Sequence, residues 1–103
     1  MLIVQGDVFL TKAVRIPRGA KQVAKGKRGY TLAEGETTGH AHVIEDDGVE
    51  LYESNGVLYV KTGKSVKLRH EEHKEVTINE GVWKVGQVQE FDAFDMEVRS
   101  VKD

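Results

Sequence analysis

All four histidines of the chain lie in two short segments, GHAH (39–42) and HEEH (70–73). Neutral imidazole is the commonest metal ligand in proteins, and it also serves as a general acid or base near neutral pH. On a β-strand, side chains two residues apart point to the same face, so His40 and His42 can reach one ion. Two ligands seldom hold a metal, so the second segment is expected to complete the site.

The sequence therefore predicts one divalent transition-metal site, and imidazole suits zinc, iron, manganese and nickel without distinguishing them. The favoured ligands are His40, His42 and His73, with His70, Glu36 or Glu72 as the fourth. An open coordination position would favour a metal-dependent hydrolase or isomerase of unknown substrate, whereas a closed site would favour a structural role. The sequence leaves both open.

Two other interpretations of the histidines stand beside the metal site. Two opposed histidines can act without metal as general acid and base on a phosphodiester, as in a phosphodiesterase or nuclease, while Lys or Arg stabilises the transition state. Alternatively, the histidines are surface groups or buried groups hydrogen-bonded to carboxylates, with no chemistry at all. A phage or host-interaction protein that forms homo-oligomers through an exposed strand edge is compatible with this last case.

Positive charge is concentrated near the start of the chain. Residues 1–33 carry seven Lys and Arg against one acid, although the net charge of the whole chain is only −2. This stretch predicts contacts to a phosphate-bearing small molecule, or less favourably a nucleic acid, unless it is simply a solvated surface. The candidate ligand-binding residues are Lys21, Lys25, Lys27 and Arg28, together with Gln87 and Gln89 on one face of a predicted strand.

The bulk composition indicates one folded domain over residues 1–103. Hydrophobic residues make up 39% of the 103 residues, which suits a single hydrophobic core. Cysteine is absent, so thiolate metal sites and disulfides are excluded. The apolar opening MLIV is too short for a signal peptide or membrane span, so we expect a cytoplasmic protein with no membrane association.

Period-two alternation of apolar and polar residues, with turn signals between the runs, predicts an all-β fold. Asp47-Gly48 and Asn55-Gly56 are each expected to form a tight hairpin turn. The expected architecture is a single small cupin-like barrel or sandwich of about nine short antiparallel strands. Those strands are predicted at 1–4, 7–16, 30–34, 40–45, 49–53, 57–61, 65–70, 75–79, 82–91 and 94–101.

Two family resemblances accompany these patterns. GETTGHAHVIEDD (35–47) resembles the first motif of the cupin superfamily, with Gly35, His40, His42 and either Asp46 or Asp47, although the second cupin motif is missing. Across nearly the whole chain, QGDVFL, LAEGETTGHAHVI, LRHEEH and VGQVQEF resemble a family of small uncharacterised bacterial and phage proteins. That resemblance implies that the two histidine segments belong to one site, and it implies no particular activity.

Overall fold

The computed structural model describes residues 1–35 and 39–88, and every regular element in this part of the chain is a β-strand. All strand pairings are antiparallel. The strands are β1 (Leu2–Gln5), β2 (Val8–Lys12), β3 (Lys21–Val23), β4 (Tyr30–Glu34), β5 (Ala41–Ile44), β6 (Val49–Ser54), β7 (Val57–Thr62), β8 (Val66–Arg69), β9 (Val76–Ile78) and β10 (Gly81–Gln87). The all-β prediction is confirmed.

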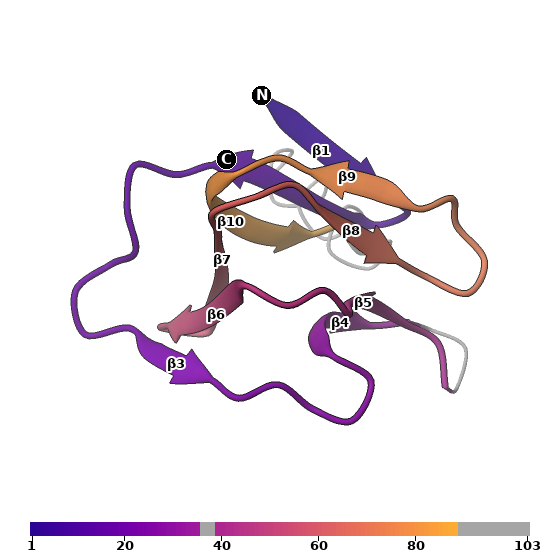
Figure 1. Ribbon diagram of the computed structural model, residues 1–103, viewed down its shortest axis with the longest axis horizontal. Coiled ribbons are helices and arrows are strands. Elements are labelled where there is room, and N and C mark those ends of the chain that lie inside the picture. Colours follow the sequence, from indigo (N-terminus) through magenta and orange to yellow (C-terminus); the bar gives the residue numbers. More distant parts are fainter. Residues whose placement is uncertain (36–38, 89–103) are drawn as a thin grey trace, which may run out of the picture.

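The strands form two sheets. One has six strands in the order β1-β2-β10-β7-β6-β3, and the other has four in the order β4-β5-β8-β9. Figure 1 shows edge strand β1 of the first sheet beside edge strand β9 of the second. Within the described residues neither sheet closes on itself, so the cupin-like barrel stays a prediction.

One hydrophobic core lies between the two sheets, because both sheets contribute to the same cluster of buried side chains. Trp83, on β10, is fully buried, and its indole N–H donates to the carbonyl oxygen of Asn79 at 2.8 Å. This satisfies the ring's one polar group and lets the largest core side chain be buried at no hydrogen-bond cost. The core cluster consists of Val8, Leu10, Leu32, Ile44, Val49, Leu51, Val60, Val66, Leu68, Ile78 and Trp83.

The two predicted hairpin turns have different outcomes. Asn55 and Gly56 have φ angles of 51° and 80° and join the paired strands β6 and β7, as expected of a type I′ turn. The hairpin prediction at Asp47-Gly48 is wrong, because β5 and β6, which this turn connects, belong to different sheets. The turn signal there marks a crossing between sheets, which the local sequence does not distinguish from a hairpin.

Strand ends also depart from the predicted ranges. The predicted strand 7–16 ends at Lys12, and Val14, which continues the apolar alternation, is 96% exposed because no neighbouring strand covers it. Strand β3 was not predicted. The predicted strand 94–101 lies outside the described residues, as does the end of the predicted strand 82–91. No helix in the described part of the chain is long and apolar enough to cross a membrane.

Candidate functional site

The two histidine segments meet because they extend the pairing of β5 with β8. These strands are antiparallel with Val43 opposite Arg69, so continuing the register by one residue places His42 opposite His70. Their ring centroids lie 4.4 Å apart. The prediction that the two segments share one site thus has a direct physical basis in strand register.

The next two pairs in the same register, Ala41 with Glu71 and His40 with Glu72, also lie close together. The backbone N–H of Ala41 donates to Oε1 of Glu71 at 3.0 Å. Beyond it, Nδ1 of His40 lies 3.3 Å from Oε2 of Glu72, a distance that gives an ion pair only if His40 is protonated. Among the described residues this buried Nδ1 has no hydrogen-bond partner, so it is a candidate ligand atom.

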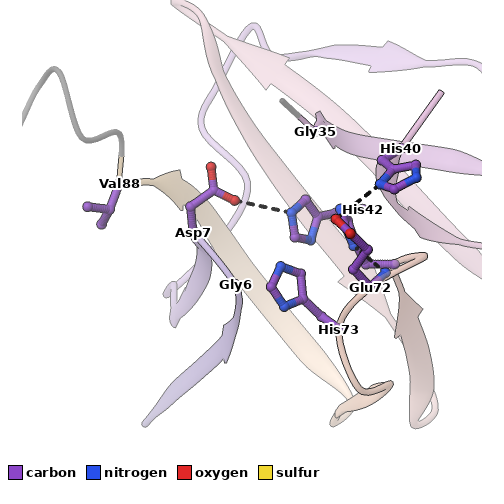
Figure 2. Close-up of a pocket in the computed structure, with 9 residues that line it drawn as sticks. Gly6, Asp7, Gly35, His40, His42, Glu72, His73 and Val88 are labelled. Carbon is purple, nitrogen blue, oxygen red and sulfur yellow. Dashed lines mark hydrogen bonds and ion pairs between the residues drawn. The ribbon is translucent and has the colours of Figure 1, made fainter. Parts of the chain in front are cut away.

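All four histidines line one pocket of about 580 Å³. Figure 2 shows three of them, His40, His42 and His73, around it. His70 is central, since its ring centroid lies 5.7 Å from that of His40 and 4.6 Å from that of His73. The ring of His73 stacks above His42 with centroids 6.0 Å apart. The full lining is Gly6, Asp7, Gly35, His40, His42, His70, Glu72, His73 and Val88.

His42 is the most deeply placed of the four histidines, with only 1% of its side chain exposed. Its Nδ1 lies 2.9 Å from Oε1 of Gln5, which is itself buried. The orientation of the Gln5 amide is set by its NH₂ group, which donates to the carbonyl oxygens of Leu68 at 2.8 Å and Lys74 at 3.0 Å. Gln5 therefore accepts from His42, so Nδ1 of His42 carries a proton and neutral His42 has its lone pair on Nε2.

That Nε2 faces the carboxylate of Asp7, whose Oδ1 is 3.2 Å away (Figure 2). Burial, reinforced by neighbouring His70, lowers the pKa of His42 below 6.5. Burial alone would raise the pKa of Asp7, but the hydrogen bond from Gln87 and further interactions leave it below its ordinary value. At neutral pH the pair is therefore a neutral imidazole beside a carboxylate.

His70 has the opposite tautomer. Its Nδ1 accepts the backbone N–H of Glu72 at 3.0 Å, so in neutral His70 the proton is on Nε2. Adjacent histidines thus offer different groups to the pocket: His42 a lone pair and His70 an N–H donor.

Glu71 holds the outer part of the site in place. One carboxylate oxygen accepts from Ala41, and the other pairs with the guanidinium of Arg28, which also donates to the carbonyl oxygen of Gly39 at 2.7 Å. The hydrogen bond from Ala41, followed by further contacts that include Arg28, lowers the pKa of Glu71 to about 2. Through these contacts Arg28 links Glu71 to Gly39, the residue before His40.

Two glycines make room for the imidazole rings. Gly6 has φ of 58° in the two-residue loop between β1 and β2, and a Cβ there would lie 2.5 Å from Nε2 of His73. A Cβ on Gly35 would lie 3.2 Å from Nε2 of His70. Any larger residue at Gly6 would meet both backbone strain and the His73 ring.

One group of three metal-binding residue types has its ligand atoms within 4.8 Å of one another in the described part of the chain: His40, His70 and Glu71. The predicted trio of His40, His42 and His73 lines the same pocket but does not approach this closely. Of the other predicted ligands, Glu72 lines the pocket and Glu36 lies outside the described residues.

The predicted ligand-binding residues are more dispersed. The amide of Gln87 donates to Oδ2 of Asp7 at 2.8 Å, so Gln87 touches the site through Asp7, and Gln89 lies outside the described residues. Lys25 pairs with Asp47 at 3.1 Å and Arg28 with Glu71, so two cations of the basic stretch are already neutralised. Lys21 and Lys27 are exposed.

The sequence interpretation missed Gln5, Asp7 and Glu71. Gln5 stands at an inward position of β1, but residues 1–4 are all apolar, so no alternation in the sequence marks that position. Asp7 follows Gly6 in a hairpin loop, where aspartate is common and carries no functional signal. Asp46 and Asp47, which the cupin resemblance suggested, contact the backbone N–H of Lys67 and the side chain of Lys25 instead.

Comparison with known proteins gives one match. Residues 4–88 match a family model described as a domain of unknown function (DUF8820). No curated protein and no solved structure matches the chain. The matched range includes both histidine segments and the Gly6-Asp7 loop.

Proposed function

We propose that this chain, which belongs to the DUF8820 family, binds one divalent transition-metal ion in its four-histidine pocket. The observation that carries the proposal is the convergence of all four imidazoles, from two segments distant in sequence, on one pocket that also contains the carboxylates of Asp7 and Glu72. Imidazole and carboxylate donors together suit zinc, iron, manganese and nickel.

The individual histidines differ in readiness to bind an ion. His42 has its Nε2 lone pair directed into the pocket, and His40 has a buried Nδ1 without a hydrogen-bond partner. His73 lies against the Gly6 loop at the pocket wall. These are the three ligands that the sequence favoured, and small rotations of exposed His73 are the adjustment that the proposal requires.

The pocket, with a volume of about 580 Å³, has room for a substrate beside the proposed ion. A bound divalent metal would supply Lewis acidity and a water of lowered pKa, as hydrolases and isomerases use. The Nε2–H of His70 would donate a hydrogen bond to the group bound there. Two facing sheets with a histidine pocket also make a cupin-like architecture the finer description that we propose for the fold.

Elemental analysis of the purified protein tests the metal proposal. We expect one equivalent of transition metal after reloading, and less than half an equivalent in His40→Ala and His73→Ala, whose side chains are not part of the core. Glu53→Ala, at an exposed position of β6, is the control and should retain the wild-type metal content. Wild-type protein that holds no stoichiometric metal after reloading would contradict the proposal.

A second candidate function is metal-free acid–base catalysis on a phosphodiester, which the opposed tautomers of His42 and His70 favour. His42 would take a proton at Nε2 and His70 would donate one from its Nε2. Hydrolysis of a model phosphodiester that resists chelators and is lost in His70→Ala would establish it. Hydrolysis that chelators abolish would instead support metal-dependent catalysis.

A further inference from the structure

The contact between His42 and Asp7 is unusual because two acceptor atoms face each other. Gln5 fixes the proton of neutral His42 on Nδ1, so Nε2 presents a lone pair to Oδ1 of Asp7 at 3.2 Å. Two lone pairs at this distance repel unless a positive charge lies between them. The positive charge would be either a proton or a cation.

The orientation of Asp7 is also set from outside the pair. The amide of Gln87 donates to Oδ2 of Asp7 at 2.8 Å, and this leaves Oδ1 turned toward His42. One amide thus orients the imidazole and another orients the carboxylate. Hydrogen-bonded partners of this kind characteristically hold metal ligands in orientation.

A cation held between the two atoms fits the distance of 3.2 Å. Charge-assisted hydrogen bonds between imidazolium and carboxylate are shorter, about 2.7–2.9 Å from nitrogen to oxygen. Two ligands bound to one ion, with metal–nitrogen and metal–oxygen bonds near 2.0–2.2 Å, lie roughly 3.0–3.4 Å apart at octahedral to tetrahedral angles. The observed 3.2 Å is the spacing of two neighbouring ligands.

We propose that Asp7 Oδ1 and His42 Nε2 are adjacent ligands of the metal ion, with Gln5 and Gln87 as positioning residues. This inference rests on the proposed metal binding and assigns the position of the ion within the pocket. His73 is the third ligand that we propose, because its Nε2 lies against Gly6, the neighbour of Asp7. The ligand atoms of Asp7, His42 and His73 do not all lie within 4.8 Å of one another, so the exposed His73 ring must turn toward the ion. The resulting two-histidine, one-carboxylate set leaves coordination positions for His40, the remaining ligand of the proposed function, and for substrate.

Two members of the other candidate trio, His70 and Glu71, already have partners within the protein, whereas the third, His40, does not. Both carboxylate oxygens of Glu71 have partners, in Ala41 and Arg28. Nδ1 of His70 accepts a backbone N–H, which leaves the proton on its Nε2. A metal at this trio would have to displace these contacts, whereas a metal between Asp7 and His42 would relieve a repulsion.

Cobalt(II) titration of the metal-free full-length protein tests the assignment, with visible absorption and a competing chelator as readouts. Asp7→Asn keeps the size of the side chain but weakens the ligand, so we expect at least about 100-fold weaker binding, and Gln87→Leu should cost roughly 10-fold. Asp47→Asn, the matched carboxylate control, should bind within about 3-fold of wild type, and Glu71→Gln, which alters the other candidate trio, should lose less affinity than Asp7→Asn.

Nitrogen NMR of the histidine rings gives a second readout that needs no substitution. Metal-free His42 should be protonated at Nδ1, and zinc should change the signal of its Nε2. No cobalt or zinc binding by wild-type protein would defeat the metal proposal itself. Wild-type binding that Asp7→Asn leaves intact and Glu71→Gln abolishes, or zinc that leaves His42 Nε2 unchanged, would overturn the Asp7–His42 seat alone.

Discussion

The pocket has two halves that are built differently. The inner half, formed by Gln5, Asp7 and His42, stands on or beside paired strands and is held by side-chain hydrogen bonds. The outer half, formed by His70, Glu72 and His73, follows the end of β8 on a segment outside the strand ladder. The inner half therefore has its donor and acceptor atoms fixed before any ligand arrives, whereas the outer half can adjust to one.

The largest expected difference between the halves is in stability. His42→Ala removes a fully buried ring and leaves Oε1 of Gln5 without its donor, so we expect a loss of about 3 kcal/mol in the free energy of unfolding. His73→Ala, at an exposed position, should change it by less than about 0.5 kcal/mol. Urea unfolding of the metal-free proteins measures both. Equal losses would show that the outer half is as fixed as the inner half.

Gln5 tests whether the inner half depends on its amide. Gln5→Leu removes the amide donor from two carbonyl oxygens and the acceptor from the Nδ1–H of His42, and we expect a loss of about 2 kcal/mol. Gln22→Leu, an exposed glutamine on edge strand β3, is the matched control and should be nearly neutral. A small loss in Gln5→Leu would mean that water replaces the amide contacts.

Gly6 joins the two halves, since its backbone belongs to the β1–β2 loop and its Cα lies against His73. Gly6→Ala should cost about 1–2 kcal/mol, from the positive φ and from the crowded ring. Combining it with His73→Ala should restore only the part due to the ring, because the backbone strain remains. A double-mutant cycle by urea unfolding measures the coupling, and strict additivity would place His73 away from Gly6 in solution.

The smallest expected effect is a pH dependence of stability that comes from Glu71, which lies between His70 and Glu72 of the outer half. Its pKa of about 2 lies below the ordinary 4.5, so the folded state favours the carboxylate and the unfolded state binds more protons between these values. Its contribution to stability is present above pH 4.5 and is lost as the pH falls toward 2. Glu71→Gln should flatten the stability profile of the metal-free protein in this window, and an unchanged slope would contradict the assignment.

Local sequence patterns predicted much of the fold because they are set by nearby residues. The range predicted for β4, 30–34, matches its observed bounds, and the Asn55-Gly56 turn has the expected left-handed φ angles. The same local signal failed at Asp47-Gly48, where strands of different sheets follow one another. Which strands pair is decided by the core, which a single turn does not encode.

Part of the candidate site was likewise visible in the sequence. The confinement of four histidines to two segments predicted a shared pocket, and the four rings do line one. Gln87 does not line this pocket but donates a hydrogen bond to Asp7, which does. The basic stretch was less informative, because Lys25 and Arg28 pair with carboxylates that lie far away in the chain. Charge density along a sequence does not report such pairings.

By itself the sequence determined the strand pattern, one hairpin turn and the presence of enough imidazole for a site. Only the tertiary structure decided which ring nitrogen of each histidine is free, because a lone pair is directed by its hydrogen-bond partners. For His42 those partners, Gln5 and Asp7, are 37 and 35 residues away, and Gln87 reaches Asp7 across 80 residues. Residue identity supplies the donor and acceptor atoms, whereas the packing of distant strands orients them.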